Sequence, residues 1–398
     1  MNFAPQSLIS VYYHGSGKKQ LLGRLLLKNR NIFFEYDISF IKTGLELSSF
    51  YLPLKTGIIP STSRTFEGLF GIFNDSLPDG WGRLLLDRKL MGLGMNPGIL
   101  SPLDRLCFVG SHGMGALSYE PETPSSSRIL PTDLDEIDYE IQEILVGNND
   151  TYIDDMIELS GSSAGARPKV LLRIKNEDWL IKFRSNIDPK DISAIEYAYH
   201  LMAVEAGLNV PEAKIFPSKK GQGFFGVKRF DRQNDRRIHM HTASGILNVD
   251  HREPSLDYET IMKATLYLTR DARQCKVQFR NAVFNILSHN RDDHSKNFSF
   301  LMDEHGTWRV SPAYDLTFSS GPSGEHSTLV MGEGKNPKRE HLLRLAEVAS
   351  IKKEEAQQII TEVTEALQKW NSFASNTGVS KLQTKNIGEA LSHLQKII

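Results

Sequence analysis

The segment Asn290-Arg291-Asp292-Asp293-His294-Ser295-Lys296-Asn297 carries the strongest signal for the fold of this chain. It follows an apolar helical pattern that ends near Leu287 and precedes a strand-like run over residues 298–301. Phosphoryl transfer to a hydroxyl needs a carboxylate that receives the alcohol proton and, a few residues later, an amide oxygen that holds magnesium. The order Arg-Asp-four residues-Asn has the spacing of a kinase catalytic loop. The segment therefore predicts a base at Asp292 and a metal ligand at Asn297, with a plain polar turn as the alternative.

A second acid follows a predicted hairpin. Strand-like runs flank the turn at residues 303–306, and the segment Pro312-Ala313-Tyr314-Asp315-Leu316 comes next. In kinases the second metal-binding carboxylate lies just past such a hairpin, where it meets magnesium that bridges the β- and γ-phosphates. Asp315 is therefore predicted to bind magnesium. The alternative is that Asp315 caps a helix over residues 316–320.

A lysine interrupts an apolar strand upstream. The run WLIKF at residues 179–183 forms a predicted hairpin with residues 170–174 and contains Lys182. Burial of an unpaired ammonium group is costly, so Lys182 needs an anionic partner. Glu196 is the expected partner, because it lies on the inward face of an amphipathic helix predicted over residues 191–206. The alternative is a lysine that extends to solvent and a solvated glutamate.

Small residues dominate the segment before that hairpin, SGSSAGARPK at residues 160–169. They let backbone amides approach phosphate oxygens closely. The segment lacks the Walker order and the dinucleotide fingerprint, and in isolation it is typical of a flexible surface loop. Its position next to the lysine-bearing hairpin instead predicts a nucleotide-binding loop, with contacts from Ser163, Ala164, Gly165, Ala166, Arg167 and Lys169.

The bulk properties fit an ordinary globular protein. Lys and Arg total 47 against 48 Asp and Glu in 398 residues, so no whole-molecule field draws the chain to nucleic acid or membrane. Cys107 and Cys275 are predicted to be buried free thiols. The first ten residues have no basic flank before a long apolar run, and we expect a cytoplasmic protein without a membrane span. His239, His241 and His251 lack partners at ligand spacing and are expected at the surface.

The distribution of patterns predicts three regions. Residues 1–125 mix short strands and helices and end in a connector rich in proline and serine. Residues 145–230 hold the glycine-rich loop, the lysine strand and a short link, and residues 231–398 are helical with the catalytic and metal-binding loops. The expected fold is α+β and two-lobed, like a protein kinase, with a mixed N-terminal lobe and an all-helical C-terminal lobe.

These motifs resemble the HipA-like serine/threonine kinases, the toxin halves of bacterial toxin–antitoxin pairs. The resemblance covers most of the chain, and its motifs occur in the family's order: SSAGARPK, WLIKF, IEYAYHLMAVEAGLNVPEAKI, FFGVKRFDR, DDHSKNFSF and PAYDL. It extends to FNDSLPDGWGRLLL in the N-terminal region. The set is far more specific than any one of its members.

The resemblance implies ATP and Mg²⁺ as cofactors. It implies that Lys182 binds the ATP phosphates and that a hinge meets adenine through Lys228, Arg229 and Phe230. It places further residues at the phosphate and metal site, namely His294, Lys296, Asn297 and, within PAYDL, Tyr314. Ser162 aligns with the loop serine that such kinases autophosphorylate, with Ser163 and Ser160 as competing acceptors. A phosphate there adds about −1.5 to −2 charges where ATP phosphates otherwise sit.

Some positions depart from the family pattern. Ser163 stands where an apolar residue is usual, Arg167 replaces a glutamine, and Pro168 removes an amide donor before Lys169. Asp293 replaces a small residue beside the base, and its like charge is expected either to raise a carboxylate pKa or to help hold metal.

The leading hypothesis is a protein kinase toxin that phosphorylates a translation-related protein, such as an aminoacyl-tRNA synthetase. The resemblance implies that a HipB-like helix-turn-helix antitoxin inhibits the toxin and that the toxin reaches DNA mainly through this antitoxin. It also allows a homodimer of the toxin within the toxin–antitoxin complex. A small-molecule phosphotransferase is the alternative, because the same base, amide and acid also serve those enzymes. A non-catalytic repressor subunit is a third hypothesis, against which the intact set Lys182, Glu196, Asp292, Asn297 and Asp315 argues.

Overall fold

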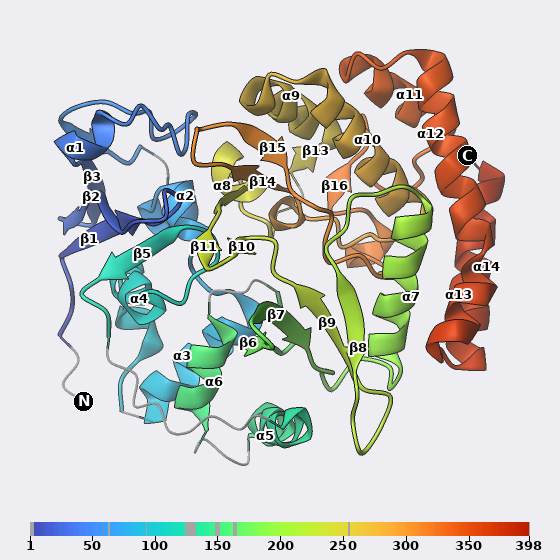
Figure 1. Cartoon of the computed structure of the whole chain (residues 1–398), viewed down its shortest axis with the longest axis horizontal. Helices are drawn as coiled ribbons and strands as arrows, with labels where there is room; N and C mark the ends of the chain where they lie inside the picture. The colour runs from blue at the N-terminus through green and yellow to red at the C-terminus, as the bar shows by residue number, and fades with distance from the viewer. Residues whose placement is uncertain are drawn as a thin grey trace. The chain divides into compact units, whose positions relative to one another are not determined.

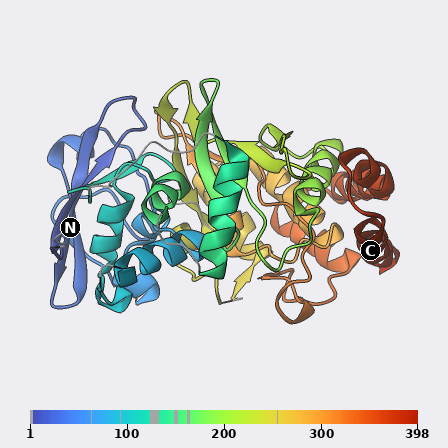
Figure 2. The same cartoon turned by 90° about the horizontal axis from the view of Figure 1, so that it is seen from below.

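The computed structural model describes residues 4–62, 64–92, 94–123, 133–147, 152–161, 165–253 and 255–397. The first of two units holds residues 1–188, 229–250 and 301–307, and the second holds residues 189–228, 251–300 and 308–398. Figure 1 and Figure 2 show the chain coloured from its N-terminus to its C-terminus. Helices and strands are mixed along the chain, so the α+β class predicted from the sequence is confirmed. Every helix in the described ranges is too short or too polar to pass through a lipid bilayer.

A five-stranded antiparallel sheet forms the N-terminal part of the first unit, in the order β4-β3-β2-β1-β5 (Figure 1). Its strands are β1 (Leu8–Tyr13), β2 (Gln20–Lys28), β3 (Asn31–Tyr36), β4 (Ile58–Pro60) and β5 (Leu117–Glu120). Alternation in β1 buries Ile9, Val11 and Tyr13 on one face. Asn29 and Arg30 both have positive φ, 51° and 63°, which closes the tight hairpin between β2 and β3.

Six α-helices precede the glycine-rich segment in the described part of the first unit. They are α1 (Ile38–Ile41), α2 (Gly71–Asn74), α3 (Gly80–Gly92), α4 (Pro102–Val109), α5 (Leu134–Val146) and α6 (Ile153–Ser160). Ser101 and Asp104 form a capping box that starts α4, with Pro102 in the first turn. Helix α4 contacts β1 and β5, while α3 packs against α6 (Figure 1). The glycine-rich segment begins at Ser160, the last residue of α6.

The predicted lysine-bearing hairpin is present in the first unit. Strands β6 (Lys169–Ile174) and β7 (Glu177–Lys182) pair antiparallel around Lys175 and Asn176, which have positive φ. Trp179 and Ile181 are fully buried, which explains the apolar character of β7. The unit is completed by β10 (Arg232–Gln233), β11 (Arg236–Arg237), β12 (His239–Thr242) and α8 (Ala243–Leu247).

The second unit is mainly helical. Its helices are α7 (Ile192–Glu205), α9 (Tyr258–Thr269), α10 (Ala272–Leu287), α11 (Arg339–Val348), α12 (Lys353–Gln368), α13 (Trp370–Thr377) and α14 (Lys381–Ile397). Gly207 has a φ of 72° just after α7, a left-handed conformation that glycine adopts readily at the end of a helix. Helices α13 and α14 lie side by side near the end of the chain (Figure 2).

Short strands interrupt the helical part of the chain. They are β8 (Ala213–Phe216) antiparallel to β9 (Phe224–Lys228), and β13 (Leu256–Asp257) parallel to β16 (Thr328–Leu329). Strands β14 (Ser299–Met302) and β15 (Trp308–Val310) flank the turn that the sequence predicts at residues 303–306. The region after residue 231 is therefore predominantly rather than wholly helical, because its two- to four-residue strands are too short to show a period of two.

The predicted burial of the two cysteines is confirmed, whereas the predicted exposure of two histidines is not. Cys107 and Cys275 are free and buried, as predicted. The surface position expected for His239 and His241 is wrong, because their side chains are 1 % and 0 % exposed. His241 Nδ1 lies 2.6 Å from a carboxylate oxygen of Asp75, and its Nε2 lies 3.1 Å from the Ser48 hydroxyl. This buried polar network explains why His241 is tolerated in the interior of the first unit, where His239 Nε2 lies 3.1 Å from the Leu47 carbonyl oxygen.

Candidate active site

The predicted catalytic loop begins where α10 ends and is anchored to that helix by an asparagine pair. The Asn290 amide nitrogens, backbone and side chain, donate to the backbone and side-chain oxygens of Asn285, each at 3.0 Å. Farther along the loop, the Asn297 side-chain nitrogen donates to the carbonyl of Asp292 over 2.7 Å. This bond uses the nitrogen end of the Asn297 amide, so its oxygen is the end left for a cation. Asp292 itself is exposed, as a base that meets a substrate must be.

Asp293, next to the predicted base, is 0 % exposed and serves as the buried anchor of the loop. One carboxylate oxygen accepts from the Tyr258 hydroxyl at 2.8 Å and lies 2.9 Å from His326 Nδ1. The other accepts from the backbone amides of Ser327 at 2.9 Å and Thr328 at 3.3 Å. Because protein donors occupy both oxygens, the expectation that Asp293 helps to hold metal is wrong. Its position instead fixes the backbone on which Asp292 stands.

The segment that carries Asp315 is bonded to the same loop on both sides. Before Asp315, the Tyr314 hydroxyl donates to the Lys296 carbonyl. After it, Ser319 pairs with the start of the loop, since its amide donates to the His289 carbonyl at 3.0 Å and a parallel bridge joins it to Asn290. These contacts bring the base loop and the predicted metal-binding acid together in the second unit.

Asp315 has an uncommon backbone conformation. Its φ is 56°, in the left-handed region, where Asp is tolerated better than most residues. Residues 316–318 are extended or irregular and Ser319 forms a bridge, so the alternative of a helix capped by Asp315 is wrong. Outliers of this kind cost about 1–3 kcal/mol and are retained where function requires them.

The residues also fit magnesium. The described part of the chain holds no group of three or more His, Cys, Asp or Glu side chains arranged around a metal. Mg²⁺ does not need one, because it is commonly held by one or two carboxylates together with waters and substrate phosphates. Asn297 and Asp315 offer oxygen ligands of that type from one bonded loop system.

The first unit contributes the predicted phosphate-binding lysines. Lys169 and Lys182 are directly opposite each other in the register of β6 and β7, and both are buried, at 5 % and 8 % exposure. Like charges directly opposite on neighbouring strands are destabilising, so this pair favours an anion nearby. Gly165 lies beside the Lys169 ammonium, because a Cβ built on this glycine would be 2.7 Å from Nζ. Glu196, in the second unit, is 2 % exposed, so the solvated-glutamate alternative is wrong, while its pairing with Lys182 stays a prediction.

The glycine-rich segment is described only in part. Ser162, Ser163 and Ala164 lie outside the described residues. Ser160 is 1 % exposed at the end of α6, where its hydroxyl donates to the Lys169 carbonyl at 3.1 Å. Arg167, which the sequence assigns to the nucleotide loop, is ion-paired with Asp188 through its Nε at 3.0 Å.

The predicted hinge residues differ in what they contact. The Lys228 amide donates to the Glu212 carbonyl at 2.8 Å in the second unit. In the first unit, the Arg229 amide donates to the Asp178 carbonyl of β7 at 2.8 Å, and its guanidinium binds Asp231 through two bonds of 2.9 and 2.8 Å. The Arg229 side chain is therefore a structural ligand of Asp231, and its backbone amide is bonded to β7.

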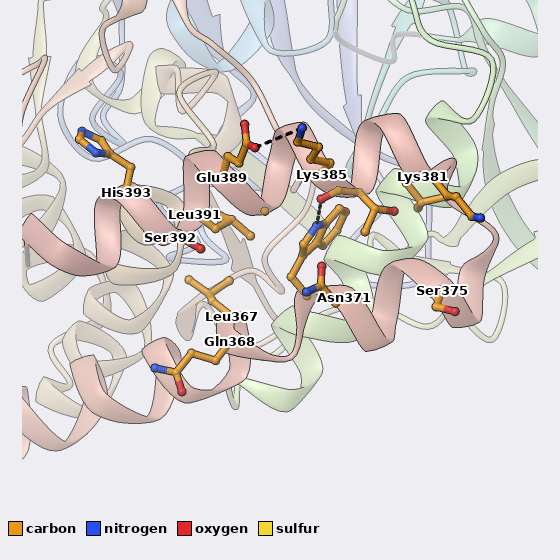
Figure 3. A pocket seen from close by; sticks show the side chains of 14 residues that line it. Leu367, Gln368, Asn371, Ser375, Lys381, Lys385, Glu389, Leu391, Ser392 and His393 are labelled. Carbon is orange, nitrogen blue, oxygen red and sulfur yellow. Dashed lines mark hydrogen bonds and ion pairs between the residues drawn. The ribbon is translucent and has the colours of Figure 1, made fainter.

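A separate pocket of about 910 Å³ lies between α13 and α14 (Figure 3). Trp370 forms part of it, with its indole nitrogen donating to the Thr384 carbonyl at 2.8 Å, and Lys385 and Glu389 lie on the rim 3.9 Å apart. None of the residues predicted from the sequence to act in phosphoryl transfer lines it.

The HipA-like C-terminal domain matches residues 161–370, and the HipA N-terminal domain matches residues 11–120. The first match alone spans more than half of the chain. This chain belongs to the HipA-like family. All residues of the base loop and of the Asp315 segment lie within the C-terminal match.

Individual relatives are distant. Y4dM of Sinorhizobium fredii, whose name provisionally calls it a kinase, is 26 % identical over 190 residues, 44 % of this chain and 44 % of that protein. A Haemophilus influenzae protein with a similar provisional kinase name is 28 % identical over 193 residues, 42 % of this chain and 56 % of that protein. The aligned part is thus about half the length of these relatives.

A solved structure shows the HipA-like fold over nearly the whole chain. It is that of the HipA, HipB and operator DNA complex of Shewanella oneidensis, to which this chain is similar with a TM-score of 0.72 and 17 % identity. The match covers 97 % of this chain and 95 % of that chain. At this identity the likeness shows the fold, and the kinase-like arrangement expected from the sequence is confirmed.

Three supporting residues were not found from the sequence. Tyr258, Asn285 and His326 form the polar surroundings of Asp293 and Asn290. The only signal available for them is a polar side chain placed in an otherwise apolar helix, such as Asn285 in α10. Tyr258 and His326 are too far from Asp293 in the sequence for a local pattern to connect them.

Proposed function

We propose that this chain is an ATP- and Mg²⁺-dependent serine/threonine protein kinase. The single observation that carries the proposal is the bonding of the loop at residues 290–297 to the segment at residues 314–319. It joins the segment that bears Asp292 and Asn297 to the segment that bears Asp315, and phosphoryl transfer uses a carboxylate, an amide and a second carboxylate in that order along the chain. Family membership and the provisional kinase names of the relatives support the same reaction.

Each residue has a proposed role. Asp292 accepts the proton of the substrate hydroxyl, while Asn297 and Asp315 hold magnesium, which neutralises charge on the transferred phosphate. Lys169 and Lys182 bind ATP phosphates, and Glu196 positions Lys182. The backbone of residues 228–230 meets adenine, and His294, Lys296 and Tyr314 complete the phosphate side. Autophosphorylation of Ser162 is proposed as the means by which the enzyme is shut off.

The biological setting follows from the family. The Shewanella structure contains HipA together with HipB and operator DNA. We propose that this chain likewise has a helix-turn-helix antitoxin as partner, reaches DNA mainly through it, and acts in the cytoplasm as a toxin. Its proposed substrate is a translation-related protein, with an aminoacyl-tRNA synthetase as the first to test.

The test is incubation of the protein with labelled ATP and cell lysate, comparing the wild type with Asp292→Gln. Loss of a positioned base lowers the rate by about 10²–10⁴, so labelled lysate proteins and self-labelling are expected to disappear in the variant. Glu389→Gln is the matched control, because this side chain is 67 % exposed on α14 and its change leaves labelling unaltered. ATP binding by the Asp292→Gln protein confirms that only the chemical step is lost.

Two results would contradict this function. Undiminished label in the Asp292→Gln protein removes Asp292 from its role. ATP turnover that is stimulated by small alcohols or amines, without a labelled protein, indicates the small-molecule phosphotransferase instead. The Asp315→Asn variant tests the metal ligand separately from the base. We expect its self-labelling to need a higher Mg²⁺ concentration than that of the wild type.

A further inference from the structure

The residues at the start of α3 contact the glycine-rich segment at two positions, Gly165 and Ser160. The backbone amide of Gly165 donates to the Asp79 carboxylate, and the Trp81 amide donates back to the Gly165 carbonyl at 3.1 Å. Both segments that make this contact lie in the first unit, although Asp79 and Gly165 are 86 residues apart in the sequence. The middle of the segment is therefore bonded to the N-terminal region through the backbone amide and the carbonyl of Gly165.

The approach is so close that side chains are excluded. A Cβ on Gly80 would lie 2.4 Å from the Gly165 carbonyl oxygen, nearer than any real contact. Gly80 also has a φ of 40° and Gly165 a φ of 104°, backbone conformations that favour glycine. The fit between the two segments thus depends on a glycine on each side.

Trp81 also contacts the first residue of the segment, Ser160. Its indole nitrogen donates to the Ser160 hydroxyl at 2.9 Å, and that hydroxyl donates to the Lys169 carbonyl at 3.1 Å. Trp81 and Ser160 are 2 % and 1 % exposed, so solvent does not compete for these bonds. Lys169 begins β6 and lies opposite Lys182, so the chain of contacts ends at the proposed phosphate-binding lysines.

We propose that Asp79 and Trp81 are positioning residues for nucleotide binding, through which the N-terminal region sets the glycine-rich segment and Lys169. This inference rests on the proposed kinase function. The bond to Asp79 is charge-assisted and therefore stronger than a neutral one, and it occupies the Gly165 amide for holding the segment rather than for holding phosphate. The nucleotide site is consequently incomplete without the N-terminal region.

The test is Asp79→Asn, which keeps the size of the side chain and removes its charge. We expect the KM for ATP and the ATP dissociation constant to rise about tenfold, since a hydrogen bond to a charged group is replaced by a weaker one. We expect kcat to change by less than about threefold, because the base and metal loops of the second unit are untouched. A general structural defect would lower kcat or the amount of folded protein instead of producing this split.

Matched variants sharpen the test. Asp87→Asn removes a carboxylate from the same helix, where its ion-pair partner is the half-exposed Arg83 at 3.8 Å, and it leaves both constants unchanged. Asp79→Glu keeps the charge and restores part of the ATP affinity. Trp81→Phe keeps an aromatic side chain, although a smaller one, and deletes the bond to Ser160. It is expected to weaken ATP binding by a smaller factor, and it replaces Asp79→Asn as the test if that variant does not fold.

ATP binding is measured by calorimetry in the Asp292→Gln background, where no turnover occurs. Equal dissociation constants for Asp292→Gln and for the double variant with Asp79→Asn overturn the inference and leave the kinase function standing. Absence of ATP binding in the Asp292→Gln protein and in the wild type overturns both. A tenfold weaker dissociation constant, with the unfolding temperature retained, supports the inference.

Discussion

Two aspartates next to predicted site residues are equally buried but are stabilised in different ways. Asp231 follows the hinge residue Phe230, Asp293 follows the base, and each is 0 % exposed. Asp231 is bonded to two guanidinium groups, those of Arg229 and Arg232, and to the Gly115 amide. Asp293 is bonded to a phenol, an imidazole and two backbone amides. The difference indicates that one anchor is ionic and the other is mostly a network of neutral donors.

The electrostatic consequence is clearest for Asp231. Burial acts to raise the pKa of its carboxyl, but attraction from Arg229 and Arg232 and the bonds from Arg229 and Gly115 outweigh it, so the pKa lies well below its ordinary value. Burial lowers the pKa of Arg232 to about 10, against the opposing attraction of Asp231. All three groups therefore keep their charges at neutral pH, and this anchor is insensitive to pH there.

The largest effect is expected from Asp231→Asn. It leaves two buried arginines without their anion, a change that typically costs about 3–5 kcal/mol of unfolding free energy. Chemical denaturation compared with the wild type measures it. Asp235→Asn is the control, because Asp235 is 73 % exposed beside a half-exposed Arg173 and its loss changes stability by about 0.5 kcal/mol or less.

The same variant tests the pH dependence. Because the folded pKa of Asp231 is depressed, its stabilisation is fully present above the unfolded value of about 3.9 and is lost as pH falls through the folded pKa. The difference between wild type and Asp231→Asn is therefore expected to be constant from about pH 5 to 8 and to shrink only in stronger acid. A difference that already shrinks between pH 7 and 5 would show that the site is not the ionic anchor described.

Asp293→Asn is expected to have a smaller effect on stability and a larger one on turnover. The amide keeps one acceptor oxygen but presents a donor to groups that also donate, which costs about 1–3 kcal/mol. Because the altered backbone carries Asp292, we expect kcat to fall about tenfold or more while the KM for ATP stays within twofold. Steady-state kinetics measure the effect on turnover, and chemical denaturation measures the effect on stability. An unchanged kcat would show that Asp293 has a purely structural role.

Local patterns were sufficient to predict the elements that carry the site. The hairpin with Lys182, helix α7 with Glu196, and the loop after α10 follow from periodicity, β-propensity and turn residues, and the structure has each of them. The positive φ values of Asp315 and Gly207 also agree with short-range chemistry, because aspartate tolerates the left-handed region and glycine adopts it readily.

The long-range partners were beyond such reasoning. Tyr258 and His326 lie 35 and 33 residues from Asp293, and Asp79 lies 86 residues from Gly165. Which polar groups meet in a core depends on tertiary packing, and no spacing rule connects them. His241 was placed at the surface for the same reason, because its partner Asp75 is 166 residues away.

The smallest effect is expected from Tyr258→Phe, which removes one neutral donor from Asp293 and leaves the aromatic ring in its edge-on contact with Phe298. One such bond contributes about 1 kcal/mol, so the unfolding free energy falls by that amount and kcat by about threefold at most. If the neutral-network description is right, Asp293→Asn with Tyr258→Phe costs less than the sum of the two single changes, because both act on one cluster. Additive costs in this double-mutant cycle would mean that Tyr258 and Asp293 act independently, and the contrast with the ionic anchor at Asp231 would then rest on His326 and the two backbone amides alone.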